Sequence, residues 1–119
     1  MSGQSYTVAS EGAIAGKRAA LGDFLRRLRV ARERGLANPE TQARVWAEQT
    51  GFPLPVGRMV VDTAQTRTVA ITDAVIAAQQ QVADFFRAAK VIPKAQTAAA
   101  YFDASFNAAA FSVGGDTIP

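Results

Sequence analysis

The sequence of 119 residues predicts a mostly α-helical fold with one or two short strands. Apolar residues recur at three- and four-residue spacing in several segments, which is the spacing of one face of a helix. Helix-start residues precede two of these segments, whereas only one short stretch has the composition of a strand. With 49% hydrophobic and 19% charged residues, the chain fits one ordinary domain. We therefore treat residues 1–119 as a single unit.

The predicted strand covers residues 5–10, where Tyr6, Thr7 and Val8 follow one another and Gly12 comes soon after. An isolated strand leaves its backbone donors and acceptors unpaired, and no second strong strand follows. We therefore expect this segment to pair with another chain or with a second copy.

Helical spacing covers most of residues 17–109. In order, the expected elements are a helix over 17–37, a helix opened by Asn38 and Pro39 that stops at Gly51, a short helix over about 54–63, an extended connector over 65–71, a helix capped by Thr72 that closes near 90–92, and a last helical element over about 97–109. Residues 112–119, with Gly114 and Gly115, are expected to form a frayed tail.

Composition excludes several kinds of chemistry. The chain has no His and no Cys, which removes the usual zinc, iron and copper ligand sets, thiol nucleophiles and His-based catalytic triads. The aspartates at 62, 73, 84 and 103 each have a local explanation as a cap, a helix-start charge or an exposed side chain. We therefore expect no enzyme, no metal and no cofactor.

The charge pattern indicates a solvated helix surface. Thirteen Lys and Arg residues stand against ten Asp and Glu residues, for a net charge of +3. The arginines cluster between residues 18 and 34, but Asp23 and Glu33 interrupt them and no aromatic residue alternates with them as a base-stacking surface requires. We expect no nucleic-acid partner. No apolar stretch approaches the ~20 residues that span a bilayer, so we expect no membrane insertion, and a cytoplasmic location for the chain as written.

Two polar residues could meet a ligand. Gln79 falls on the apolar stripe of its helix, so it could face a ligand cleft, although an amide there more commonly binds a nearby backbone group and fixes the helix against its neighbour. Arg67 lies between Thr66 and Thr68 in the connector, where a cation flanked by hydroxyls could bind an anion. The alternative is an ordinary solvent-exposed loop arginine.

The order of the segments carries more information than any one of them. The relevant stretches are 6–10, 17–25, 37–40, 48–54, 71–84, 91–94 and 101–107, and the most specific is 71–94, with its Gln79-Gln80 pair and its Ile92-Pro93-Lys94 end. From Ser5 to about Asn107, this order resembles the carboxyl-terminal part of an ABC-transporter substrate-binding protein of the aliphatic sulfonate, nitrate and taurine type.

The resemblance implies a two-lobed type II periplasmic-binding (α/β) fold, of which this chain would be the helical carboxyl-terminal portion of lobe 1, with residues 5–10 as the hinge strand. It also implies capture of a small anionic solute, delivery to an ABC permease, and a periplasmic or extracellular location. On this reading the ligand-binding candidates are Ser5, Tyr6, Thr7, Arg67 and Gln79. The chain is well under half the usual family length, so we expect a truncated cleft wall.

Another interpretation stays open. A lone strand, and helices with apolar faces on several sides, would leave apolar area exposed unless another chain covers it. We therefore expect a homo-oligomer, or association through exposed apolar faces. The competing function is a stand-alone helical protein-interaction module or oligomeric scaffold with no small-molecule ligand. An enzyme would need activity that survives without His or Cys.

Overall fold

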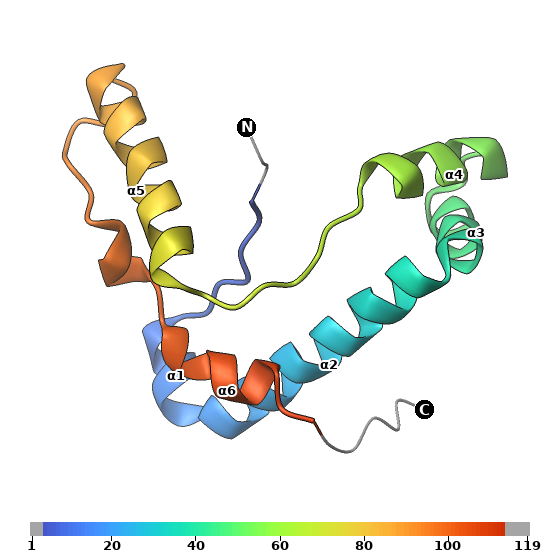
Figure 1. Cartoon of the computed structure of the whole chain (residues 1–119), viewed down its shortest axis with the longest axis horizontal. Coiled ribbons are helices and arrows are strands. Elements are labelled where there is room, and N and C mark those ends of the chain that lie inside the picture. The colour runs from blue at the N-terminus through green and yellow to red at the C-terminus, as the bar shows by residue number, and fades with distance from the viewer. Residues whose placement is uncertain (1–3, 114–119) are drawn as a thin grey trace.

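The computed structural model describes residues 4–113 as a series of helices joined by short turns and by two longer linkers, residues 64–72 and 89–97 (Figure 1). The helices are α1 (Glu11–Gly16), α2 (Arg18–Ala37), α3 (Pro39–Thr50), α4 (Leu54–Thr63), α5 (Asp73–Ala88), the 3₁₀ turns η1 (Ala98–Tyr101) and η2 (Ala104–Phe106), and α6 (Asn107–Ala110). The predicted mostly α-helical class is confirmed. Residues 114–119 of the expected frayed tail lie outside the described residues.

The predicted strand over residues 5–10 is wrong. This segment belongs to no strand, and none is present anywhere in residues 4–113. The physical reason is that a strand needs a second strand for its backbone hydrogen bonds, and the described chain offers none. The segment instead ends at Ser10, whose hydroxyl accepts a hydrogen bond from the Ala13 N–H at 3.2 Å. Ser10 thereby starts α1, a short helix that was not among the elements expected from the sequence.

The predicted boundaries of the next helices are confirmed, although one cap differs. Asn38 separates α2 from α3, but its side chain does not cap α3 and instead donates from Nδ2 to the Arg34 carbonyl at 2.9 Å. Pro39 occupies the first turn of α3, where its missing N–H leaves no broken bond. Gly51 ends α3 at φ 75°, a conformation that favours glycine.

Helices α3 and α4 form a tight hairpin around small residues. Ala43 and Ala47 are buried in α3, and Gly57 is buried in α4. A Cβ atom on Gly57 would come within 2.5 Å of the Ala43 carbonyl oxygen, so the helix backbones are in direct contact there. Gly57 lowers the intrinsic helix propensity of α4, but it is what lets α4 pack this closely.

The predicted helix over 97–109 is also wrong as a single element. Phe102 and Asp103 have extended backbone conformations and divide the segment into η1, η2 and α6. The Asp103 carboxylate accepts a hydrogen bond from the Ser105 N–H at 3.0 Å and so begins a new turn. Such a local side-chain bond competes with continued helix. Tyr101 is 75% exposed, whereas Phe102 and Phe106 are half-buried.

The whole arrangement is open. Figure 1 shows α5 and the α3–α4 hairpin standing apart, joined through the long α2 helix and the extended connector after α4. The radius of gyration is 17.3 Å, against about 13.5 Å for a compact domain of this length. The only buried hydrophobic residues in the described part are Val30, Ala43, Ala47, Ala98 and Ala110. The larger apolar side chains therefore lack full cover.

Candidate functional site

A wide apolar hollow of about 890 Å³ lies between α2, α5, the 3₁₀ turns and the two extended segments of the chain. We call this space the hollow. Its apolar walls include Leu21, Phe24 and Leu28 from α2 and Val75, Val82 and Phe86 from α5. These residues follow the helical period in each helix, so both apolar stripes predicted from the sequence face the same space. Phe24 is nevertheless 51% exposed, because nothing in the described chain fills the hollow.

All five candidate ligand-binding residues line the hollow, namely Ser5, Tyr6, Thr7, Arg67 and Gln79. They come from three separate segments: the amino-terminal extended stretch, the connector before α5, and α5 itself. The structure thus brings together residues that are up to 74 positions apart in the sequence.

Tyr6 joins the amino-terminal stretch to α5. Its hydroxyl donates to Gln4 Oε1 at 2.6 Å and lies 3.3 Å from Gln79 Oε1. Its ring meets Phe102 edge to face, with the centroids 5.1 Å apart. Edge-to-face contact is a favoured geometry for two aromatic rings. Tyr6 is therefore held by a polar contact at its tip and an apolar contact at its ring.

Ser5, Thr7 and Arg67 are exposed around the same space. None of the three side chains makes a hydrogen bond or an ion pair to another residue between positions 4 and 113. Their donors remain available to an incoming group. Thr68, next to Arg67, has a hydroxyl oxygen that is shielded from solvent without a partner.

Gln80 has the structural role that the sequence suggested for Gln79. Its Oε1 accepts from the Ala98 N–H at 2.8 Å, and its Nε2 donates to the Gln96 carbonyl at 2.9 Å. Nε2 also lies 2.8 Å from Asp84 Oδ1. Gln80 thereby fastens the segment before η1 to α5, which leaves Gln79 directed at the hollow and Tyr6. The sequence alone does not distinguish the roles of these two neighbouring glutamines. Their roles differ because residues 96–98 lie beside Gln80.

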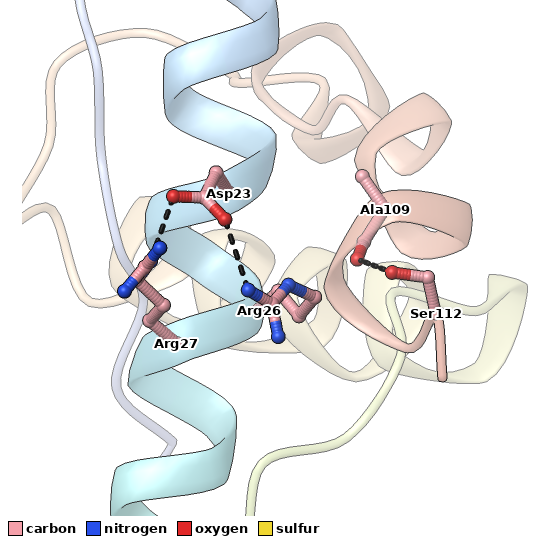
Figure 2. Close-up of polar contacts among 5 residues, drawn as sticks. All are labelled: Asp23, Arg26, Arg27, Ala109 and Ser112. Atoms are coloured by element: carbon pink, nitrogen blue, oxygen red, sulfur yellow. Dashed lines mark hydrogen bonds and ion pairs between the residues drawn. The ribbon is translucent and has the colours of Figure 1, made fainter. Parts of the chain in front are cut away.

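Arg32 is a lining residue that the sequence did not single out. It belongs to the arginine cluster of α2, in which several other arginines form ion pairs with nearby carboxylates. Figure 2 shows the Asp23 carboxylate bound to two of these arginines, to Arg27 Nε at 2.8 Å and to Arg26 Nη2 at 3.0 Å. The same figure shows a second contact, in which Ser112 Oγ donates to the Ala109 carbonyl at 2.9 Å. Arg32 lines the hollow without an ion pair to any described residue.

Arg29, one turn away from Arg32, is fully engaged. It binds Glu33 at 2.8 Å and donates from Nε to the Ala110 carbonyl at 2.8 Å. The hollow therefore has two cations without ion pairs in the described chain, Arg32 and Arg67. Its cationic edge is shared between α2 and the connector.

Two carboxylates, Asp103 at the hollow and Asp23 elsewhere on α2, are held in their charged form. Hydrogen bonds from the Ser105 hydroxyl and N–H lower the pKa of Asp103, and Arg18 adds to the effect. Hydrogen bonds from Arg27 and then Arg26 lower the pKa of Asp23. No group of three or more potential metal ligands is found within residues 4–113. The residues present can thus offer apolar contact, hydroxyl donors and guanidinium groups to a bound molecule.

Comparison with known proteins gives no match. No protein-family model matches the chain, and no curated protein or solved structure is significantly similar to it. Among the described residues, no helix has the length and apolar character to cross a bilayer. The resemblance to sulfonate-type substrate-binding proteins therefore stays a prediction from the sequence.

Proposed function

We propose that the chain forms one wall of a small-anion site in a solute-binding protein of the sulfonate, nitrate or taurine type, and that it is not an enzyme. One observation supports this most directly: all five residues chosen from the sequence as ligand contacts line the same hollow. A second supports it in chemistry, since the hollow combines a cationic edge with apolar walls. An alkyl chain with an anionic head needs both.

In this proposal Arg67 meets the anionic head, because a guanidinium offers paired N–H donors that match planar and tetrahedral oxyanions. Ser5 and Thr7 donate from their hydroxyls, and Tyr6 and Gln79 close one side of the site. The apolar walls of α2 and α5 accommodate the aliphatic part of the solute. Closure of two lobes around the solute would then form the state delivered to an ABC permease, in the periplasm or outside the cell.

The wall in this chain is incomplete, so the site needs further protein surface to close. The hollow is open, and Phe24 in its wall is half exposed, so water reaches the site. Water weakens the attraction between a guanidinium group and an anion. We therefore expect weak sulfonate binding by the chain alone.

The test is calorimetric titration of the 119-residue chain with taurine and with short alkanesulfonates. Saturable binding that weakens in Arg67→Gln supports the proposal. Arg87→Gln is the matched control, because Arg87 is also exposed but does not line the hollow. The titration is run at a concentration where the chain is monomeric. Absence of saturable binding by the monomeric chain contradicts the anion site, as does equal binding by the two variants.

A second candidate function is a helical protein-interaction module with no small-molecule ligand. The specific observation in its favour is the exposed apolar surface, which includes Phe85 at 62% and Met59 at 61% exposure, both outside the hollow. Exposed apolar side chains that gather into patches are typical of protein interfaces. A stable oligomer that ignores sulfonates in the same titration would favour this function over the first.

A further inference from the structure

The exposed area of the chain is as large as that of a protomer taken out of an assembly. Its solvent-accessible surface is 8845 Å², whereas a compact monomer of this mass exposes about 6,200 Å². The excess is about 2,600 Å² per chain, and obligate homodimer interfaces bury about 2,000–5,000 Å² in total. Covering the excess on two chains would therefore give an interface at the upper end of that range.

The distribution of charge indicates which surfaces would meet. The α3–α4 hairpin, residues 39–63, has three acidic and two basic residues and so a net charge of −1. The remainder of the chain then has a net charge of +4, because the whole chain has +3. Two hollows facing each other would bring Arg32 and Arg67 against the same residues of the partner. The acidic hairpin is the better complement to the cationic hollow.

The hairpin also has the form of an inserted element. Val45 and Glu48 lie on the side of α3 opposite the buried Ala43 and Ala47, and both are exposed. On α4, Met59 and Asp62 lie on the side opposite Gly57 and are likewise exposed. Each outer side of the hairpin thus has an apolar residue and a carboxylate. Neither carboxylate forms an ion pair with another residue in the described part of the chain.

The hairpin does not line the hollow of its own chain. Figure 1 shows the hairpin standing at the far end of α2 from α5. We propose that a second copy of this chain fills the hollow: the α3–α4 hairpin of each protomer inserts between α2 and α5 of the other in a two-fold reciprocal dimer. Glu48 and Asp62 of the hairpin approach Arg32 and Arg67 of the partner's hollow. A two-fold arrangement satisfies both hollows with the same contact.

Charge reversal tests this pairing. One variant is Arg32→Glu with Arg67→Glu, and the other is Glu48→Arg with Asp62→Arg. All four side chains are exposed, so each variant should retain its helical circular dichroism. Each variant alone places like charges at both contacts and should raise the dimer dissociation constant at least about tenfold in sedimentation equilibrium. Mixing the two variants restores opposite charges at both contacts, so a one-to-one heterodimer should return to about the wild-type affinity.

A wild-type chain that stays monomeric across the concentration range overturns the proposal. Variants that dimerise as well as the wild type, or a mixture that fails to recover affinity, also overturn it. The anion proposal is judged separately. The Glu48→Arg, Asp62→Arg variant keeps Ser5, Tyr6, Thr7, Arg67 and Gln79 and should be monomeric with an open hollow, so its sulfonate titration reports on the anion site without competition from a partner's hairpin.

Discussion

Asn107 holds the backbone of Ile71 with both polar atoms of its amide. The Ile71 N–H donates to Asn107 Oδ1 at 2.9 Å, and Asn107 Nδ2 donates to the Ile71 carbonyl at 2.8 Å. The two residues are 36 positions apart. Ile71 lies just before α5, and Asn107 begins α6, which packs against α2. The pair therefore fixes the start of α5 relative to α2 and α6, and with it the position of one wall of the hollow.

Replacement of Asn107 by Ala should reduce stability. The change leaves the partly buried N–H and carbonyl of Ile71 without their partners, which costs about 1–3 kcal/mol in the free energy of unfolding. Urea unfolding followed by circular dichroism measures the loss. Asn38→Ala is the control. The hydrogen bond from the Asn38 side-chain amide to the Arg34 carbonyl is exposed, so its loss should lower the free energy of unfolding by less. Equal losses in the two variants would contradict the structural role given to Asn107.

Gly57→Ala should separate α3 from α4. A Cβ there comes within 2.5 Å of the Ala43 carbonyl oxygen, and a backbone atom cannot move aside cheaply. We expect a loss of about 1–3 kcal/mol in the free energy of unfolding, despite the higher helix propensity of alanine. In Gly12→Ala the new Cβ meets nothing within 4 Å, so propensity alone applies and stability should stay the same or rise. A stabilised Gly57→Ala chain would show that the two helices do not pack this closely.

Acid should weaken the same hairpin through Glu40. Hydrogen bonds from Arg58 lower the pKa of Glu40 below its ordinary value of 4.5 in the folded chain. The folded chain therefore binds fewer protons at this site than the unfolded chain. The resulting stability is present above pH 4.5 and is lost as the pH falls through the lowered folded-state pKa. Both side chains are about half exposed, so the effect should be small.

The measurement is the urea midpoint of the monomer across this acidic range. Glu40→Gln should flatten the decline below pH 4.5 relative to the wild type. Glu48→Gln is the comparison, since Glu48 is in the same helix without an arginine partner in the described chain. If Glu40→Gln and the wild type lose stability in parallel as the pH falls, the Arg58 contact does not contribute.

In the monomeric chain the hollow should bind a neutral apolar dye such as Nile red. Phe24→Ser removes an aromatic wall residue and should lower dye fluorescence, while the free energy of unfolding changes by less than about 1 kcal/mol because the ring is already half exposed. Phe85→Ser is a matched control, since Phe85 is 62% exposed but lies outside the hollow. Equal dye signals from both variants would mean that the dye recognises general apolar exposure and not this space.

Much of the helical structure could be predicted because its signals are local. Pro39, Gly51 and Thr72 mark helix ends by backbone conformation and capping, which depend on near neighbours. The strand over 5–10 was wrong because strand composition does not supply a partner strand. The break at Phe102 and Asp103 was missed because an alanine-rich stretch masked the local bond from Ser105 to Asp103.

The candidate site could be predicted only in part. Arg67 and Gln79 stood out as a connector cation and an amide on an apolar stripe, and the structure places both at the hollow. Arg32 was hidden among six arginines of one segment, since separating it from them requires knowing which carboxylates and carbonyls occupy the others. The roles of Gln79 and Gln80 depend on residues 96–98, which lie 16 or more positions away.

The proposed dimer implies that the hollow is open in the single chain and is covered only by association. Small-angle X-ray scattering along a concentration series, paired with sedimentation on the same samples, separates an open monomer from a dimer. We expect a dimer at high concentration that dissociates on dilution to a monomer with a radius of gyration near 17.3 Å. A solitary monomer at every concentration, with a radius of gyration of about 13.5 Å, would contradict it.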